Sequence, residues 1–506
     1  MIKNVLEYLE ASAGRYPEKT AFADRERSCT FEGLLKRARR IGSGLAGRIP
    51  PRRPVPVLMD KGVDTIAVFM GIVCAGCFYT LVDIRQPKSR IRQILDALDT
   101  EMVVSSRAYA DQLEKMGFEG QVLWLEELDA GSANEALLEE IRRRSRDTDP
   151  LYGIFTSGST GVPKGVVVCH RSVIDFIDHF TKLFGITSQD VIGNQAPWDF
   201  DVSVKDIYSG LKTGAEVQII PKKLFSFPVE LLDFLCEHRV TTLIWAVSAL
   251  CMITALRGFD YRIPDCVKRV LFSGEVMPQK HLRQWMQALP GAEFVNLYGP
   301  TEITCNCTYY RVKNVPGDGA HLPIGRPFPN ETVFLLDEED HEITVPGKKG
   351  EICVAGTALA LGYYNNFEQT RKVFVQNPLN TWYPEKIYRT GDLGYYGEDG
   401  ELYFSSRKDF QIKHMGHRIE LGEIEAAMGN IEGIGRCCCI FDRRKNRMEA
   451  FYEGNLEKRQ IKKLLGMWLP AFMIPSGFHR VDCFPLTKNG KTDRDALKRM
   501  AEEGIL

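Results

Sequence analysis

The sequence predicts an α/β protein with a large N-terminal domain over residues 1–406 and a small α+β C-terminal domain over residues 410–506. At 506 residues the chain is too long for one hydrophobic core, because single cores stop growing at about 250–300 residues. From residue 55 to about 300, short apolar runs alternate with amphipathic stretches, which indicates largely parallel sheets flanked by helices. Beyond about residue 320, short strands separated by Gly/Pro turns predict a small β region.

The individual elements follow from the same periodicities. Buried strands are predicted over 55–59, 101–105, 121–125, 215–220, 241–247 and 269–274. Helices are predicted over 66–76, 173–184 and 231–238. The C-terminal part continues with a helix at 422–431, a strand at 436–442 and a helix at 458–469. A domain boundary is expected near residues 407–409, because the preceding DGELYFS is typical of one arm of a hairpin.

The composition excludes several functional classes. A net charge of −1 argues against a dedicated binder of nucleic acid or of membrane surfaces. The two cysteine-rich apolar segments, 74–77 and 437–439, are expected to be packed core thiols in a reducing compartment. Acidic Glu7 and Glu10 stand where a signal peptide needs an apolar region, and the uncharged run 240–256 is expected to combine a strand with the start of a helix. We therefore expect a cytoplasmic protein.

The segment 156–165, TSGSTGVPKG, has the most informative chemical content. Glycines let a backbone turn its N–H groups inward as an anion-binding nest, hydroxyls add donors, and the lysine supplies a mobile positive charge. Apolar residues 151–155 and 166–168 flank the segment, so a strand–loop–strand setting is expected, with a helix starting near Ser172. The spacing is not that of a Walker P-loop. We interpret the segment as a polyphosphate cradle; an ordinary Gly/Ser hairpin loop is the alternative.

Six further segments combine polar, glycine and charged residues in unusual ways. They are FDVS at 200–203, NLYGPTE at 296–302, GEICVAGTALALGYY at 350–364, YRTGDLG at 388–394, RKDFQIKHMGHRIELGEIE at 407–425 and NGKTDR at 489–494. Each one alone is also compatible with a capped turn or a solvated loop. Gly42, Gly44 and Gly47 match the dinucleotide-binding pattern GxGxxG, but they follow a helix-like basic stretch instead of a strand, so no Rossmann site is expected there.

Taken in order, these segments resemble the adenylate-forming enzyme superfamily, and within it the amino-acid adenylation domains of nonribosomal peptide synthesis. The resemblance covers residues 5 to 500, and FDVS with YGPTE favours the amino-acid-activating branch over fatty acyl-CoA ligases and luciferases. It implies ATP-dependent activation of an amino acid as aminoacyl-AMP, with Mg²⁺ as the metal, followed by transfer to the phosphopantetheine thiol of a carrier protein. Adenylate formation needs charge stabilisation around phosphorus more than acid–base chemistry.

The resemblance also implies a set of nucleotide-binding residues. They are Thr156, Ser157, Gly158, Ser159, Thr160, Lys164, Gly274, Asn296, Tyr298, Gly299, Asp392 and Arg407. In this set Asn296 and Tyr298 match the adenine contacts. Asp392 matches the carboxylate that accepts the ribose hydroxyls, with Arg407 beside it.

Three catalytic residues are implied in the same way. Thr301 matches the contact to the α-phosphate, Glu302 matches the Mg²⁺ ligand, and Lys491 matches the lysine that bridges substrate carboxylate and phosphate. Lys488 is a local competitor for that role, although the NGK spacing favours Lys491. A hinge at Asp409, within residues 407–410, would rotate a mobile C-terminal domain between the two half-reactions.

The substrate pocket is implied residue by residue. Asp201 matches the contact to the substrate α-ammonium; capping of the following helix is its alternative role. The remaining substrate positions are Val202, Lys205, Ala246, Leu271, Ser273, Leu297, Cys305 and Asn306. Because a buried ammonium without a partner is costly, Lys205 favours a substrate with an acidic side chain. A small substrate such as alanine or serine is the alternative, if Lys205 fills the pocket or reaches water.

The leading interpretation is a stand-alone, monomeric ligase that serves a separate carrier protein, since no carrier motif follows NGKTDR. A D-alanine–carrier protein ligase of teichoic acid synthesis is an alternative, although that group commonly has a cysteine where this chain has Ser273. Asp201 argues against an acyl- or aryl-CoA ligase. Lys491, Asp392 and Glu302 argue against a catalytically dead scaffold protein.

Overall fold

The computed structural model describes residues 2–157, 162–315, 317, 321–408, 411–442, 444–485 and 492–503. The chain forms two compact units. The first consists of Met1–Asp83, Thr100–Ile154 and Val166–Lys408, and the second of Ile84–Asp99, Phe155–Gly165 and Asp409–Leu506. The division into domains 1–406 and 410–506 with a hinge near 407–410 stays a prediction.

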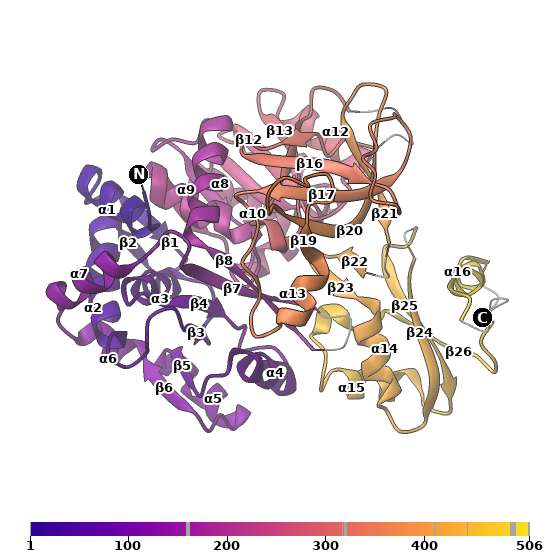
Figure 1. Ribbon diagram of the computed structural model, residues 1–506, viewed down its shortest axis with the longest axis horizontal. Coiled ribbons are helices and arrows are strands. Elements are labelled where there is room, and N and C mark those ends of the chain that lie inside the picture. Colours follow the sequence, from indigo (N-terminus) through magenta and orange to yellow (C-terminus); the bar gives the residue numbers. More distant parts are fainter. Residues whose placement is uncertain are drawn as a thin grey trace. The chain divides into compact units, whose positions relative to one another are not determined.

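The first unit contains a nine-stranded sheet (Figure 1). Its order is β15 (Arg326–Pro327), β14 (Thr308–Arg311), β13 (Glu293–Tyr298), β12 (Arg269–Ser273), β11 (Thr242–Ala246), β9 (Val191–Asn194), β10 (Glu216–Ile219), β1 (Thr20–Ala23) and β2 (Ser28–Thr30). The strands from β13 to β1 are parallel, and the edge strands are antiparallel. The central strands are apolar runs buried on both faces, as parallel sheets require, and the strands predicted at 215–220, 241–247 and 269–274 are confirmed.

A seven-stranded sheet contains most of the other predicted strands. Its order is β18 (Gly362–Tyr363), β8 (Lys164–Cys169), β7 (Pro150–Thr156), β4 (Phe78–Leu81), β3 (Pro54–Val57), β5 (Met102–Ser105) and β6 (Gln121–Trp124). β7 and β8 confirm the strand–loop–strand setting of the glycine-rich segment. The helix predicted near Ser172 is α8 (His170–Leu183).

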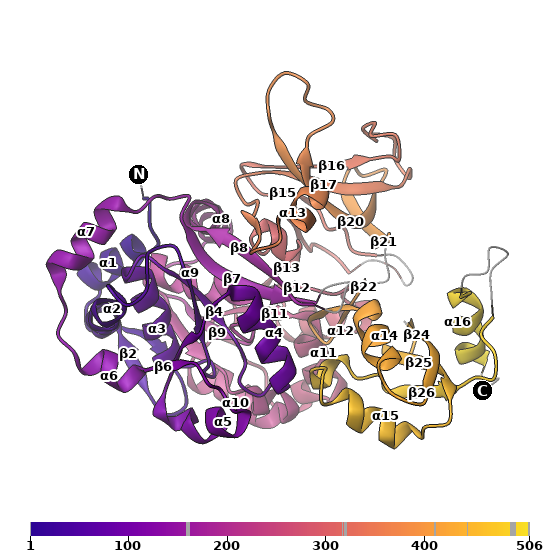
Figure 2. The ribbon, with the colours of Figure 1, turned by 60° about the horizontal axis from the view of Figure 1, so that its bottom comes forward.

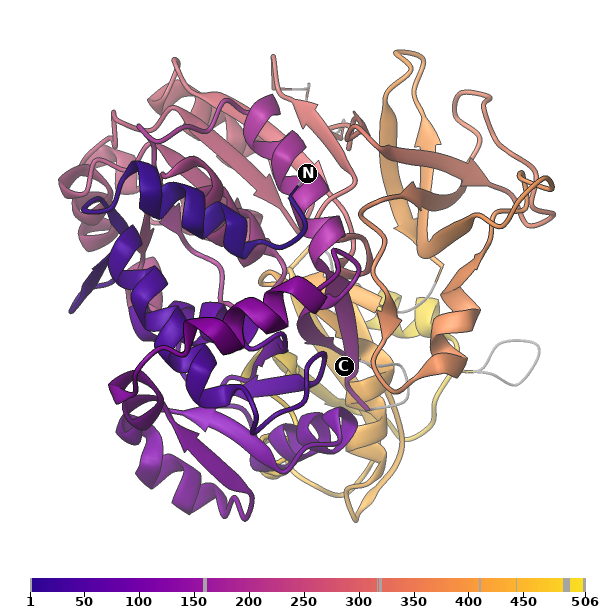
Figure 3. The ribbon, with the colours of Figure 1, turned by 60° about the vertical axis from the view of Figure 1, so that its left-hand side comes forward.

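Helices cover the sheets of the first unit, and the indigo and purple helices stand in front of the strands in Figure 3. Besides α8 they are α1 (Leu6–Arg15), α2 (Phe31–Leu45), α3 (Val63–Cys74), α5 (Ala110–Met116), α6 (Leu125–Ala130), α7 (Glu135–Arg144), α9 (Val202–Thr213), α10 (Pro228–Glu237), α11 (Val247–Ala255), α12 (Gln279–Ala288) and α13 (Phe367–Val373). Short 3₁₀ turns are η1 (Arg107–Tyr109), η2 (Lys222–Ser226), η3 (Gly258–Asp260) and η4 (Thr301–Ile303). No helix among the described residues is long and apolar enough to span a membrane.

Gly42, one of the glycines that match GxGxxG, has a packing role. Gly42 and Gly44 lie inside α2, and a Cβ on Gly42 would lie 2.5 Å from Cys74 Cβ. On the facing helix α3, a Cβ on Gly71 would lie 2.5 Å from Ile41 Cγ2. Gly42 and Gly71 therefore let α2 and α3 pack closely, and the stretch before the pattern is helical, as expected.

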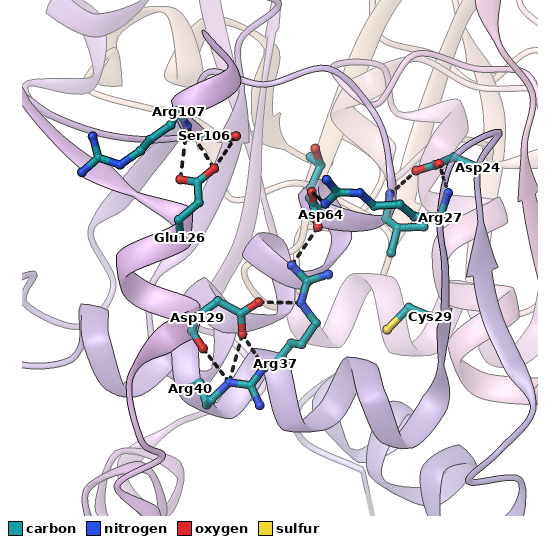
Figure 4. Close-up of polar contacts among 12 residues, drawn as sticks. Asp24, Arg27, Cys29, Arg37, Arg40, Asp64, Ser106, Arg107, Glu126 and Asp129 are labelled. Atoms are coloured by element: carbon teal, nitrogen blue, oxygen red, sulfur yellow. Dashed lines mark hydrogen bonds and ion pairs between the residues drawn. The ribbon is translucent and has the colours of Figure 1, made fainter. Parts of the chain in front are cut away.

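A cluster of charged side chains connects α2 to α3 and α6 through ion pairs (Figure 4). Arg37 on α2 pairs with Asp64 on α3 at 2.8 Å and with Asp129 on α6 at 2.7 Å. Arg40 binds the other oxygen of Asp129 at 2.6 Å, and Arg27 pairs with Asp64. We call these five side chains the Arg37 cluster.

The predicted β region is a separate sheet of the first unit, seen beside the two large sheets in Figure 2. It contains β16 (Glu331–Leu336), β17 (Gly350–Gly356), β20 (Lys386–Tyr396) and β19 (Phe374–Gln376), with β21 (Leu402–Arg407) also paired to β20. The pairings are antiparallel, which lets short turns connect the strands.

The second unit has its own core. It contains the hairpin β22 (Gln411–His414)–β23 (His417–Glu420), the sheet β24 (Ile434–Asp442)–β25 (Arg447–Gly454)–β26 (Gly477–Arg480), and the helices α4 (Lys88–Leu98), α14 (Leu421–Gly429), α15 (Lys458–Leu465), η5 (Ala471–Met473) and α16 (Arg494–Glu503). The helix, strand and helix predicted at 422–431, 436–442 and 458–469 are confirmed. Cys438 and Cys439 are buried free thiols, as expected. An ion pair between Arg90 and Glu423 joins α4 to α14.

Candidate active site

Three neighbouring parallel strands of the nine-stranded sheet bring predicted substrate residues together at their carboxyl ends. Ala246 ends β11, Ser273 ends β12, and Leu297 lies near the end of β13. In the register of the sheet, Ala246 pairs with Ser273, and Ser273 pairs with Leu297. Leu271, two residues before Ser273, points to the same face and is buried. Ligands of open α/β sheets bind at this edge, so the cluster lies where a pocket is expected.

Helix α9 begins next to this edge and carries the charged residues of the predicted pocket. Asp201 is its N-cap residue, followed by Val202, but the Asp201 side chain makes no capping hydrogen bond to the helix. One turn later, Lys205 Nζ donates to Asn306 Oδ1 at 2.5 Å. Cys305 Sγ donates to the backbone oxygen of Asp201 at 2.9 Å. The structure therefore brings Asp201, Lys205, Cys305 and Asn306 together from two segments far apart in sequence.

Lys205 is unusual in being a completely buried cation. Its exposed fraction is 0%. Burial lowers the pKa of its ammonium, against the opposing effect of the Cys305, Asp201 and Asp206 side chains. Among the described residues, Asn306 Oδ1 is its one hydrogen-bond partner, and no carboxylate forms an ion pair with it. An ammonium has three donors, so two N–H groups of Lys205 have no acceptor among the residues that the structure describes.

The turn that presents Cys305 and Asn306 has a strained backbone. Thr304 and Cys305 have φ angles of +49° and +76°, which side chains other than glycine rarely adopt. The turn is held by the Thr304 hydroxyl, which donates to Ala358 O at 2.7 Å, and by Cys307 N, which donates to Tyr298 O at 2.8 Å. Strain of this kind concentrates at functional sites, where the surrounding structure maintains it.

The glycine of the YGPTE segment is required by this turn. A Cβ on Gly299 would lie 2.5 Å from Asn306 Cα, so no other residue fits without a shift of the backbone. Gly299 thus has a packing role whatever its part in nucleotide binding. Gly274, another predicted nucleotide contact, directly follows β12 and is partly exposed.

A second polar group forms around Asp392 in β20. Tyr298 at the end of β13 donates its hydroxyl to Asp392 Oδ2 at 2.6 Å, and Arg407 in β21 pairs with Asp392 Oδ1 at 2.7 Å. Burial, followed by the Asp392 carboxylate, raises the pKa of the Tyr298 hydroxyl well above its ordinary value. Asn296, two residues before Tyr298, donates to Pro323 O at 2.8 Å. Tyr298, Asp392 and Arg407, which were all predicted to bind the nucleotide, are therefore neighbours.

Glu302 is a buried carboxylate in the turn η4, next to Thr301. The hydroxyl of Tyr363 donates to Glu302 Oε1 at 2.7 Å, and Ala360 N donates to Glu302 O at 2.9 Å. Tyr363 was not among the site residues predicted from the sequence. The one feature that could have pointed to it is its position directly after Gly362 in the segment 350–364.

The remaining predicted residues lie elsewhere or outside the described residues. Thr156 ends β7, and Ser157 follows it and donates its hydroxyl to Arg418 O at 2.5 Å within the second unit. Lys164 begins β8. Gly158, Ser159, Thr160, Lys488, Lys491 and Asp409 lie outside the described residues. Among the residues that the structure describes, no three His, Cys, Asp or Glu side chains form a metal-binding group.

Comparison with known proteins identifies the family of this chain. The family model of the AMP-binding enzymes matches residues 9–364. Zwittermicin A synthase ZmaJ of Bacillus cereus is 31% identical over 506 residues, which cover 98% of this chain and 94% of the relative. Tyrocidine synthase 1 of Brevibacillus parabrevis is 30% identical over 501 residues, and there the alignment spans 98% of this chain but only 45% of the relative.

Solved structures share the fold over nearly the whole chain. PA1221, an NRPS protein containing adenylation and PCP domains, superposes with a TM-score of 0.84 at 25% identity, covering 98% of this chain and 84% of that chain. The adenylation domain AlmE of Vibrio cholerae has a TM-score of 0.84 at 20% identity, covering 99% and 98% of the two chains, a likeness that shows the fold alone. The chain belongs to the AMP-binding enzyme family and is an ATP-using, adenylate-forming enzyme of the nonribosomal-peptide adenylation type.

Proposed function

We propose that this enzyme activates an amino acid with ATP as aminoacyl-AMP, releases pyrophosphate, and transfers the aminoacyl group to the phosphopantetheine thiol of a separate carrier protein. The observation that carries the choice of an amino acid is the Asp201 carboxylate. Asp201 occupies an N-cap position without capping the helix, so helix capping does not account for a carboxylate at the edge of the pocket. A carboxylate in a partly dry pocket is a strong partner for an α-ammonium group.

The group around Asp392 supports a nucleoside site. Tyr298 and Arg407 each occupy one oxygen of Asp392 and fix the orientation of the carboxylate. Each oxygen of a carboxylate has two lone pairs, so each can accept one further hydrogen bond from a ribose hydroxyl. In this proposal Asn296, Tyr298, Gly299 and Gly274 line the adenine side.

The catalytic step is proposed to depend on Glu302, Thr301 and Lys491. The Glu302 carboxylate is a hard oxygen donor whose position Tyr363 fixes, which fits a Mg²⁺ ligand; bound Mg²⁺ neutralises phosphate charge. Thr301 would contact the α-phosphate, and Lys491 would stand between the two anions that react. The glycine-rich segment with Thr156, Ser157 and Lys164 is proposed to hold the outer phosphates, and Asp409 to act as the hinge.

Carrier-protein transfer is supported by the kind of protein that this chain resembles. PA1221 contains adenylation and PCP domains in one protein and is 25% identical to this chain. A D-alanine–carrier protein ligase and an acyl- or aryl-CoA ligase are the alternative outcomes of the test below.

An amino acid with an acidic side chain is the proposed substrate. The Lys205 side chain is 0% exposed, so it does not reach bulk water, and its one partner in the described part of the chain is a neutral amide oxygen. A substrate carboxylate would supply the missing charge and acceptors, and thereby offset the cost of burying the ammonium.

ATP–pyrophosphate exchange with a panel of amino, fatty and aryl acids tests this proposal. We expect exchange with aspartate or glutamate and none with fatty or aryl acids, and we expect the aminoacyl group on a phosphopantetheinylated carrier protein by mass spectrometry. Exchange with D-alanine alone would favour the teichoic acid alternative. Exchange with alanine or serine would exclude the acidic substrate. Exchange with fatty or aryl acids would exclude amino-acid activation.

A further inference from the structure

Lys61, in the loop between β3 and α3, binds three backbone oxygens and one side-chain oxygen of the segment 194–196. Its Nζ lies 3.0 Å from Asn194 Oδ1 and 2.9 Å from Gln195 O, and 3.4 Å from both Asn194 O and Ala196 O. Burial lowers the pKa of Lys61 to about 7. Because oxygen atoms of amides only accept hydrogen bonds, Lys61 Nζ is the donor in these contacts.

The segment 194–196 is joined to two elements of the proposed amino-acid pocket. Asn194 ends β9, and its Nδ2 donates to Asp206 Oδ2 on α9 at 2.6 Å. Gln195 Oε1 accepts a hydrogen bond from the backbone N–H of Ala246, at the end of β11, at 3.2 Å. A displacement of the segment would therefore be transmitted to both α9 and β11.

Asp206 depends on this segment for its position. It is 0% exposed and directly follows Lys205 in α9, and burial raises its pKa to about 7. Its Oδ1 has no hydrogen-bond partner among the described residues, so the Asn194 amide is the bond that holds its carboxylate. Polar groups buried with few partners are sensitive to the loss of any one of them.

We propose that Lys61 is a positioning residue for the amino-acid pocket, which it maintains by holding residues 194–196 against α9 and the end of β11. The inference rests on the proposed amino-acid function and adds a residue outside every predicted motif. Helix α9 carries Asp201 and Lys205, and a displacement of about 1 Å can cost an enzyme about 100-fold in kcat/KM. The group around Asp392 lies on β13, β20 and β21, so ATP binding should not depend on Lys61.

Lys19 provides a matched control at the other end of the same helix. Its Nζ binds the backbone oxygens of Ser188 and of Gly214, the latter at 2.6 Å, and Gly214 is the C-cap residue of α9. Burial lowers the pKa of Lys19 as it does that of Lys61. Lys19→Met therefore removes a comparable lysine–carbonyl contact without touching the pocket end of α9.

The test measures KM for the amino acid and for ATP by pyrophosphate exchange in Lys61→Met, Lys61→Gln, Lys61→Arg and Lys19→Met. We expect Lys61→Met to raise KM for the amino acid about tenfold or more while KM for ATP stays within about twofold. Lys61→Gln keeps two donors and buries no charge, so it should show a smaller rise in KM for the amino acid. It tests the same point if Lys61→Met does not fold. Lys61→Arg, which keeps the charge and several donors, should restore much of the amino-acid affinity.

Three results would overturn the inference. They are an unchanged KM for the amino acid in Lys61→Gln, a parallel rise of both KM values in the Lys61 variants, or the same rise in Lys19→Met. Failure of the proposed function is distinct, because the wild-type enzyme would then show no exchange with any amino acid, before a variant is compared.

Discussion

Arg37 of the Arg37 cluster and Lys205 of the predicted pocket are both cations largely withdrawn from water, but they differ in their partners. Arg37 lies between the carboxylates of Asp64 and Asp129, and its side chain is 19% exposed (Figure 4). Lys205 is 0% exposed and has the neutral amide oxygen of Asn306 as its one partner among the described residues. Both regions belong to the same compact unit.

Under the proposed function, the difference separates cations that stabilise the fold from a cation that pairs with the substrate. In the Arg37 cluster, opposite charges compensate each other inside the protein, so the cluster stabilises the contact between α2, α3 and α6. In the pocket, Lys205 has donors without an acceptor among the described residues, and the proposed acidic substrate would supply those acceptors on binding. Variants in each region should therefore change different measurable quantities.

Apart from substitutions of Lys205, Asp201→Asn should have the largest effect on KM for the amino acid. The loss of a charge-assisted hydrogen bond to the substrate α-ammonium should weaken binding by about 1.5–3 kcal/mol. KM for the amino acid should rise about 10- to 100-fold while KM for ATP is unchanged, as measured by pyrophosphate exchange. An equal rise of both KM values, or a large loss of thermal stability, would assign Asp201 to the structure of α9 instead of the substrate.

Arg37→Met should change stability and leave catalysis intact. Because Arg37 is partly buried, we expect the free energy of unfolding to fall by about 2 kcal/mol, between the values typical of exposed and of buried ion pairs. Chemical denaturation measures this loss. KM for the amino acid and for ATP should stay at their wild-type values, and a change in either would remove the distinction between the two regions.

His170 is a buried side chain that is kept neutral, and it should give the stability of the protein a smaller, pH-dependent contribution. Its Nδ1 accepts a hydrogen bond from Val5 N at 3.3 Å, and burial lowers its pKa from an ordinary value of 6.5 to about 3. Between these two values the unfolded chain binds a proton that the folded protein does not, so stability is lost as the pH falls below about 6.5.

His170→Asn tests this dependence, since an asparagine oxygen can still accept from Val5 N but does not titrate. Lowering the pH from 6.5 to 5.5 should destabilise the wild-type protein by about 1 kcal/mol more than the variant, because each pH unit of full titration is worth about 1.4 kcal/mol. Equal losses in the two proteins, measured by denaturation at both pH values, would show that His170 is protonated in the fold.

Much of the fold was predictable because its central strands are apolar runs that are buried on both faces. β11 and β12 follow directly from such runs, and the basic stretch that carries Gly42 and Gly44 is helical, as its pattern indicates. The two-residue strands β15 and β18 have no such pattern. The grouping of 84–99 with the C-terminal unit depends on tertiary contacts such as Arg90–Glu423, which a local pattern does not encode.

In the candidate site, the residues found from sequence lie in segments of unusual composition, such as Asn296–Glu302. Lys61 and Tyr363 were missed for a different reason. Lys61 binds mostly backbone oxygens, which every residue type possesses, so its partners leave no pattern in the sequence. The roles of the predicted site residues stay predictions until variants are measured.

Lys205→Met provides the most direct measurement of the central claim, because it removes the buried ammonium at nearly constant side-chain volume. We expect the binding of aspartate or glutamate, measured by pyrophosphate exchange, to weaken by about 2–5 kcal/mol, because one partner of a buried charge pair is removed. The free energy of unfolding should be unchanged or higher. Lys212→Met, at the far end of α9 where Lys212 pairs with Asp178 at 2.6 Å, should leave exchange unchanged. Undiminished exchange with acidic amino acids in Lys205→Met, or alanine activation that is unaffected or improved, would contradict the account.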